Sequence, residues 1–376
     1  MSEEQVRAVH PHVVISKRRF ARVFGEDGPG DAPVKEVLER LAAALVEEHG
    51  SGDSDCAVPL RGLKRLFMQE ADAILAADVS IEDAREATAI EHGFDGWDEV
   101  EAGCDRRLRP AFERAADMVV EGRLDSLRTA LDLDGDLVTD ASPYGHRCTL
   151  LHYVAANGIE LRRQTSPANL RSIAELLLDR GAHVDARAGT YGGDANQTPL
   201  ALLVTSAHPA EAGVQVDVVR LLLAKGAKPD GVDDSGAPLR FALEFGHLDA
   251  ARALVDAGAR VEDLPAAAGL GLVRQVARLF EAADAAARGR ALVRAAQHGR
   301  RDVVAWLLDR GVPIGAAPDR GVTALHEAAH GGHDEVVDLL LAREADVGRK
   351  DAVHDATPAG WAEAGGHEGL AARLRR

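Results

Sequence analysis

The sequence predicts an all-α solenoid of about eight helix–turn–helix repeats, some of them degenerate, behind a small N-terminal helical region. The clearest repeat lies at residues 321–345, where two short apolar-striped segments flank a turn at Gly332-His333. Similar pairs recur at intervals such as the 32 residues from Gly226 to Gly258. A hydrophobic content of 46% with only 4% aromatic residues fits short helices packed through alanine, leucine and valine. No strands are expected.

The net charge, the cysteines and the absence of long apolar runs limit the partners and the compartment that we expect for this chain. The net charge of −17 makes nucleic acid and anionic membranes poor partners for this surface. The three cysteines, Cys56, Cys104 and Cys148, are odd in number and lack a CxxC spacing. They indicate a reducing, cytoplasmic compartment, with neither a disulfide scaffold nor a cysteine zinc site. The chain has no long apolar run and no basic segment before an apolar core, so neither a transmembrane helix nor a signal peptide is expected.

Residues 1–30 are expected to form an N-terminal arm. Its basic cluster could contact a phosphate, but in an acidic chain we favour an arm that docks Phe20 and Phe24 on the body. Residues 31–105 are expected to form the helical region, in which Ser80-Ile-Glu-Asp83 resembles a capping box. The helices expected there cover residues 33–48, 60–76 and 81–92, followed by a short helix that Asp95 caps.

The repeat array is expected over residues 110–376. Repeat one, residues 111–139, lacks the four-residue motif that opens five of the other repeats, and such an atypical first repeat is typical of a capping unit. The motif opens repeats two, three, four, seven and eight at Thr149-Leu-Leu-His152, Thr198-Pro-Leu-Ala201, Ala237-Pro-Leu-Arg240, Thr323-Ala-Leu-His326 and Thr357-Pro-Ala-Gly360. Repeats five and six, near residues 264–286 and 290–315, have lost this motif. Their finger turns, the turns that join successive repeats, are shortened or lost.

Repeats two and three are longer than the others. Gly181 and Gly226 are 45 residues apart, which is 12 more than the 33-residue period. Five of these lie in the turn before Thr198 and seven between the two helices of repeat three, near residues 206–215. Repeat two has about 11 extra residues at its own junction between helices, near residues 158–172. Adjacent repeats stack in register, so these two inserts should lie side by side. Insertions in repeat proteins commonly fall on the binding face.

These motifs resemble the ankyrin repeat, in which T-P-L-H opens the first helix and G-H-x-x-V-V-x-x-L-L-x-x-G-A crosses the second. Residues 84–102, with Phe94 and Trp97 as packing residues, are similar to an element that precedes the repeats in one group of bacterial ankyrin proteins. The similarity continues through the inserts of repeats two and three and spans residues 84–376. The resemblance implies an ankyrin solenoid that binds a protein or peptide through a preorganised concave face, and it names no substrate.

His326-Glu327-Ala-Ala-His330 matches the HExxH zinc motif, with two imidazoles on one helical face. The resemblance gives another interpretation, because this histidine of the ankyrin motif closes the turn before the first helix. His333 is then the ordinary histidine before the second helix. We therefore predict no metal and no cofactor, and we expect His152 to close the equivalent turn of repeat two.

The predicted function is non-catalytic recognition of a protein or peptide by a monomer, through the concave face and the inserts of repeats two and three. The alternative is an enzyme or small-ligand receptor with a pocket built from Tyr144, His146, Tyr191 and His208. A scaffold for the product of a neighbouring gene is a third possibility. No catalytic residue is assigned. The candidate binding residues are Tyr144, His146, Arg147, Asn157, Arg163, Tyr191, Asn196, Gln197, Thr205, Ser206, His208, Glu244, Phe245 and His330.

Overall fold

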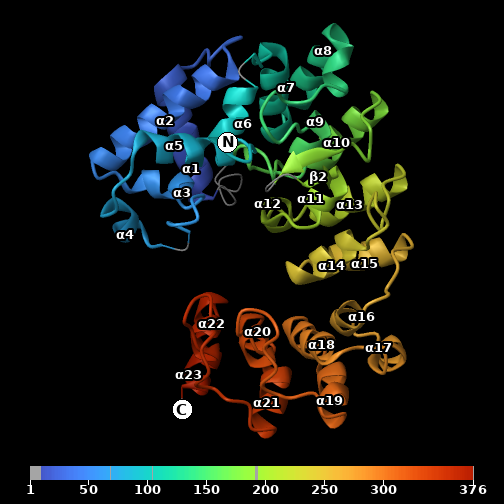
Figure 1. Ribbon diagram of the computed structural model, residues 1–376. Helices are drawn as coiled ribbons and strands as arrows, with labels where there is room; N and C mark the ends of the chain where they lie inside the picture. Colours follow the sequence, from blue (N-terminus) through green and yellow to red (C-terminus); the bar gives the residue numbers. More distant parts are fainter. Residues whose placement is uncertain (1–9, 68, 104, 191–193, 376) are drawn as a thin grey trace. The chain divides into compact units, whose positions relative to one another are not determined.

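The computed structural model describes residues 10–67, 69–103, 105–190 and 194–375, with residues 194–196 described by their backbone alone (Figure 1). These residues form 23 α-helices and one two-stranded sheet, which confirms the predicted all-α solenoid. They fall into two compact units, unit 1 up to Asp233 and unit 2 from Asp234 onward. No helix among the described residues is both long and apolar enough to cross a membrane.

Unit 1 begins with the N-terminal helices. They are α1 (Pro11–Phe24), α2 (Val34–Gly50), α3 (Ala57–Leu60), α4 (Ala71–Leu75), α5 (Ile81–Glu91) and α6 (Trp97–Ala102), with the 3-10 turn η2 (Ser54–Cys56). The capping box predicted at the start of α5 is confirmed, because Ser80 and Asp83 each accept a hydrogen bond from the other's backbone N–H. Phe94 is buried and Trp97 is half-buried against the core formed by Val34, Val37, Leu38 and Leu41 of α2, here called the α2 core. Both act as packing residues.

The structure adds detail to one expectation for this region and corrects another. The arm contains a 14-residue helix, α1, which packs against α2 and buries Val13 and Arg19. Its phenylalanines, Phe20 and Phe24, do dock on the α2 core as predicted. The helix expected over residues 60–76 is wrong, because the chain there forms α3, a series of turns and α4. Turns suffice to bury Leu63 and Leu66, so no continuous helix is needed for that purpose.

The first three repeats complete unit 1. They contain α7 (Pro110–Val120), α8 (Leu124–Leu133), η3 (Gly135–Val138), α9 (Leu150–Tyr153), η4 (Leu161–Arg163), α10 (Leu170–Asp179), α11 (Pro199–Leu203), α12 (Ala207–Glu211) and α13 (Gln215–Ala224). The first helices α7, α9 and α11 contact one another in succession, and so do the second helices α8, α10 and α13. The insert of repeat two contains η4, and the insert of repeat three contains α12.

The expectation that the chain has no strands is wrong, because one turn between repeats contains a two-stranded hairpin. Strands β1 (Ala188–Thr190) and β2 (Asp194–Gln197) form an antiparallel hairpin that pairs Ala188 with Gln197 and Thr190 with Asp194. The hairpin lies in the lengthened turn before Thr198. The extra residues there let the chain fold back and satisfy its own backbone hydrogen bonds.

Unit 2 holds repeats four to eight in two layers (Figure 1). Its helices are α14 (Ala237–Glu244), α15 (Leu248–Asp256), α16 (Leu264–Leu270), α17 (Val273–Phe280), α18 (Ala285–Gln297), α19 (Arg301–Asp309), α20 (Ala324–His330), α21 (Asp334–Ala342), α22 (Pro358–Ala364) and α23 (Glu368–Leu374). The first helices α14, α16, α18, α20 and α22 contact one another in order. The second helices α17, α19 and α21 do the same. Alanine, valine and leucine fill the space between the layers.

Replacing Leu340 with alanine should lower the stability of unit 2 by about 2–5 kcal/mol, because this fully buried α21 side chain leaves a cavity in the core. The matched control is Leu272→Ala, which removes the same atoms from a side chain that is 40% exposed. It should cost less than about 1 kcal/mol. Urea unfolding followed by circular dichroism measures both changes, and equal losses would contradict the assigned core.

Candidate functional site

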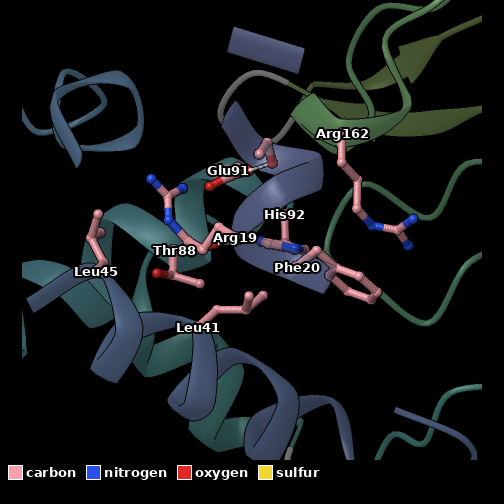
Figure 2. Close-up of a pocket in the computed structure, with 9 residues that line it drawn as sticks. Arg19, Phe20, Leu41, Leu45, Thr88, Glu91, His92 and Arg162 are labelled. Atoms are coloured by element: carbon pink, nitrogen blue, oxygen red, sulfur yellow. Dashed lines mark hydrogen bonds between the residues drawn. The ribbon is translucent and has the colours of Figure 1, made fainter. Parts of the chain in front are cut away.

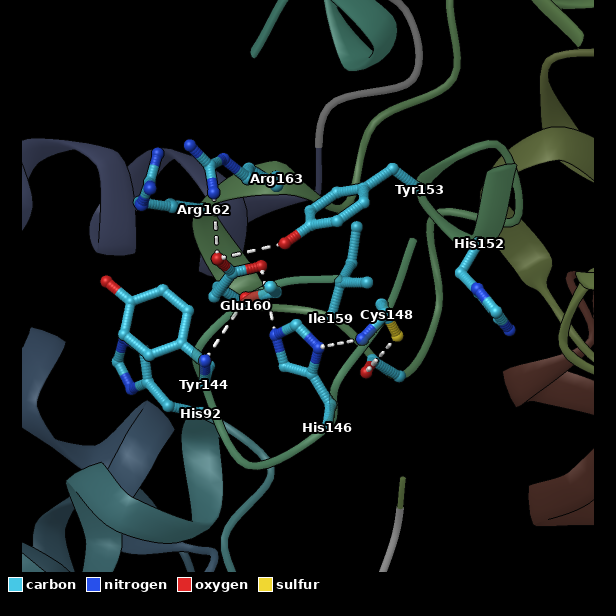
Figure 3. Close-up of polar contacts among 12 residues, drawn as sticks. His92, Tyr144, His146, Cys148, His152, Tyr153, Ile159, Glu160, Arg162 and Arg163 are labelled. Atoms are coloured by element: carbon cyan, nitrogen blue, oxygen red, sulfur yellow. Dashed lines mark hydrogen bonds and ion pairs between the residues drawn. The ribbon is translucent and has the colours of Figure 1, made fainter. Parts of the chain in front are cut away.

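The insert of repeat two is organised by a buried network of charged side chains (Figure 3). Arg163, at the end of η4, is only 1% exposed, and Glu160 is completely buried. Helix α7 of repeat one supplies the two other carboxylates, Glu113 and Asp117. The network therefore joins repeat one to the insert of repeat two.

Arg163 bonds to all three carboxylates. Its Nη1 donates to Glu113 Oε2 at 2.7 Å and to Glu160 Oε1 at 2.8 Å, while Nε donates to Asp117 Oδ1 at 2.8 Å. Its Nη2 donates to the backbone carbonyl of Glu113 at 2.8 Å. Arg162 adds a 3.2 Å ion pair to Asp117. Each carboxylate thus gains a charge-assisted hydrogen bond that offsets the cost of its removal from water.

The charges of this network hold its carboxylates ionised. Burial alone would raise the pKa of Glu160, but Arg163 and His146 keep that pKa well below the usual range. The pKa of Asp117 is lowered in the same way, because Arg163 and Arg162 outweigh its burial. The network consequently stays charged throughout the neutral range.

His146 and two tyrosines close the network on the side of the Tyr144–Cys148 turn (Figure 3). The backbone N–H of Cys148 donates to His146 Nδ1 at 3.1 Å, so the ring proton lies on Nε2, 3.5 Å from Glu160 Oε2. Tyr153 donates its hydroxyl hydrogen to Glu160 at 3.4 Å. Tyr144 stacks against His92 with ring centroids 4.8 Å apart. The N-terminal helices therefore meet the repeats at this turn.

A small cavity adjoins the network between α1, α2 and α5 (Figure 2). Its volume is about 10 Å³, and Phe20, His92 and Arg162 are among the side chains that line it. That space holds at most one water molecule. Tyr144, His146 and Arg163 are almost fully buried, so in this arrangement their side chains hold the insert in place.

The other candidates from repeats two and three lie in several environments. Arg147 is exposed, whereas Ser206 and His208 are buried. Asn157 donates to the hydroxyl of Thr205 at 2.9 Å, so the starting points of the two inserts adjoin, as predicted. Gln197 is half-buried at the end of β2, and the structure describes only the backbone of Asn196. Tyr191 lies outside the described residues.

The turn histidines take the structural role expected of them. In repeat seven, Thr323 N–H donates to His326 Nδ1 at 3.2 Å, and His326 Nε2 donates to Ala356 O at 3.2 Å. His152 makes the equivalent contacts with Thr149 at 3.1 Å and with Ala186 at 3.1 Å. Both nitrogens of each ring are thus used by the backbone. Among the described residues, no group of three metal-binding side chains has the geometry of a metal site.

Unit 2 contains a groove that the sequence pattern does not predict. Helix α18 has 13 residues, whereas α16, α20 and α22 have 7 each, and only residues 281–284 separate it from α17. A longer first helix has taken the place of a finger turn. The groove beside it measures about 580 Å³, and its apolar lining includes Leu264, Pro265, Leu279, Ala283 and Ala287.

Three arginines, Arg240, Arg290 and Arg294, line the same groove. Arg290 reaches Asp319 only at 4.0 Å. Among the described residues, no carboxylate lies within ion-pair distance of Arg240 or Arg294. Burial lowers the pKa of Arg294, whose guanidinium donates to the carbonyl of Leu243 at 3.3 Å and to the side chain of Gln297, both of them neutral acceptors. The sequence predicts the missing finger turn, but it does not predict that residues of α14 and α18 line one groove.

Four carboxylates also line the groove, and three of them have partners within the fold. Asp263 caps α16 by accepting from Ala266 N at 2.7 Å. Glu262 lies 3.4 Å from Arg260, and Asp319 is the distant partner of Arg290. Glu244, the fourth carboxylate, is exposed. Of the remaining predicted contact residues, Phe245 follows Glu244 and is 58% exposed, and His330 is exposed at the end of α20.

Stacked two-helix units with short turns place this chain in the class of α-helical repeat proteins. Residues 266–351 match the family model for ankyrin repeats, in three copies. The chain is also 30% identical over 195 residues to the ankyrin repeat and KH domain-containing protein mask-1 of Caenorhabditis elegans. That match covers 49% of this chain and only 7% of the worm protein. Residues 266–351 of this chain are therefore similar to ankyrin repeats.

Replacing Arg163 with methionine should destabilise unit 1 by about 3–5 kcal/mol, because it leaves buried Glu160 without its guanidinium partner. Arg180→Met is the control. It breaks a surface pair with Asp132 whose side chains are 32% and 59% exposed, and it should cost about 1 kcal/mol or less. Chemical denaturation at pH 7 compares the two variants. A small effect at Arg163 would show that the network does not hold the insert.

The stability of unit 1 should fall as the pH drops from about 6.5 toward 4. Burial lowers the pKa of His152 to about 4, so the unfolded chain binds a proton that the folded chain excludes. His152→Gln removes this titration and keeps a side-chain acceptor at the capping position. Urea midpoints measured across this pH range should therefore decline less steeply for the variant than for the wild type. Parallel curves would argue against a buried neutral imidazole.

Proposed function

We propose that this protein binds a protein partner, without catalysis, and that the partner contributes a short peptide segment to the groove of unit 2. Ankyrin repeats are generally protein–protein interaction modules, which supports the class of partner. The observation that carries the proposal is the groove where a finger turn has been lost. Its volume of about 580 Å³ suits a few side chains in an extended peptide.

The lining of the groove favours a segment with small apolar side chains next to an aspartate or glutamate. Leu264, Leu279 and Ala283 offer an apolar surface to the partner's apolar atoms. Arg290 and Arg294 are one turn apart on α18. Among the described residues, Arg290 has only Asp319, at 4.0 Å, and Arg294 has no carboxylate within ion-pair distance. A carboxylate from the partner would provide the missing compensation. Phe245, exposed after α14, extends the apolar contact beyond the groove.

The inserts of repeats two and three belong to unit 1 and offer few side chains to a partner. Their predicted contact residues Tyr144, His146 and Arg163 are buried in the ion network, so they are poor candidates for direct contact with a partner. A hollow of about 550 Å³ does adjoin the network, and Glu113, Asp117 and Arg163 are among its lining residues. Tyr144, His146 and His208, which define the enzyme alternative, do not line it, so we do not favour that alternative. We therefore propose partner contacts at Glu244, at Phe245 and at the three groove arginines, Arg240, Arg290 and Arg294.

Selection of a random peptide display library on the intact protein should enrich apolar segments that carry aspartate or glutamate. Arg290→Glu should weaken binding of a selected peptide about tenfold, because it places a like charge beside the peptide carboxylate. Arg274→Glu, at an exposed position that does not line the groove, is the charge-matched control and should change affinity less than about twofold. Fluorescence anisotropy measures both.

Enrichment of basic peptides, or equal losses in both variants, would contradict the proposed groove.

A further inference from the structure

Three histidines meet where α1 contacts the insert of repeat three. The ring centroids of His10 and His208 are 4.5 Å apart, those of His10 and His12 are 5.3 Å apart, and those of His12 and His208 are 5.7 Å apart. His10 and His12 belong to the start of α1, and His208 lies in α12. These helices are nearly 200 residues apart in sequence, so the rings form a tertiary contact within unit 1.

We infer that His10, His12 and His208 form an acid-sensitive latch, which fastens the start of α1 to α12 at neutral pH and releases it in mild acid. Neutral imidazoles pack edge to face, as His208 does against both partners at interplanar angles of 77° and 75°. Three imidazolium rings at these separations repel one another. Protonation thus turns an attractive aromatic contact into a repulsive one.

The neighbouring charges compensate only part of that repulsion. His10 Nε2 lies 2.8 Å from Glu211 Oε2 on α12. Glu91 on α5 faces His12 but already accepts a hydrogen bond from Ser16 at 3.0 Å, and Gln164 from the insert of repeat two bonds to His12 without adding charge. His208 faces His10 and His12, and its Nδ1 is buried without a hydrogen-bond partner among the described residues. Two carboxylates thus face three imidazoles.

The docked state binds fewer protons than the released state. Burial, followed by the charges of His10 and His12, lowers the pKa of His208 to about 4. Burial and His10 also lower the pKa of His12. A released imidazole titrates at about 6.5. The contact is therefore fully formed above about pH 6.5 and is lost progressively as the pH falls toward 4.

Release is confined to one end of α1. Further along the helix, Arg19 donates to Glu48 at 2.8 Å with both side chains 5% exposed. Phe20 stacks on the guanidinium of Arg162 at 4.1 Å. These contacts contain no histidine, so they keep the rest of α1 in place. Acid would free α12 and the first turn of α1, and would expose a surface of the repeat-three insert that neutral pH conceals.

Hydrogen–deuterium exchange of the intact protein at pH 7.0 and pH 5.0, corrected for intrinsic amide exchange, tests the latch. Protection at residues 11–15 and 207–213 should fall at least about tenfold at pH 5.0, while protection of residues 37–45 in α2 stays within about twofold. Equal losses in all three segments, or no loss in the first two, would overturn the proposal, because either result excludes a local release.

The double variant His12→Gln/His208→Phe keeps side chains of similar shape and removes two titrating rings. Its acid-induced loss should shrink to about threefold or less. His183→Gln, at an exposed position in unit 1, should behave as the wild type. A full acid-induced loss in the double variant refutes the latch. If the double variant is unprotected at both pH values, the single variant His12→Gln decides the test. It must shift the midpoint of release to lower pH. An unchanged midpoint refutes the proposal.

Discussion

The burial of Arg163 determines how unit 1 is assembled. A guanidinium can be removed from water only if carboxylates and carbonyls replace its hydration, and Glu113, Asp117 and Glu160 do so here. Two of these carboxylates come from α7 and one from the insert of repeat two. The insert is consequently held against repeat one by buried ion pairs. Arg162 extends the same arrangement to α1 through its contact with Phe20.

This assembly changes what the inserts contribute. Insertions in repeat proteins often supply contacts to a partner. Here the side chains of Arg162 and Arg163 in η4 and of His208 in α12 are buried inside unit 1. Their remaining role is to position α1, which fits a contact that responds to pH. Unit 2 differs, because repeats five and six lost a finger turn and gained a groove. The groove of unit 2 therefore lies where a finger turn is missing, and not where an insert has been added.

The sequence predicted the repeats well, because each depends on local rules. Threonine at the start of a first helix caps it, a histidine three residues later closes the turn, and a leucine stripe marks the second helix. The same reasoning failed over residues 60–76, where apolar spacing suggested one helix and turns bury the side chains equally well. Some candidate binding residues, such as Tyr144 and His146, lie on unusual segments of the repeats, and spacing alone does not reveal whether such residues point outward or inward.

The sequence by itself determined the repeat architecture, the places where it departs from regularity and the structural role of His152 and His326. Those features follow from hydrogen bonds and apolar contacts within or between neighbouring repeats. Only the tertiary structure decided that Glu160 and Arg163 are buried, that His10 meets His208, and that Arg240 and Arg290 share a groove. These pairings depend on the packing of segments up to about 200 residues apart, which no local periodicity encodes.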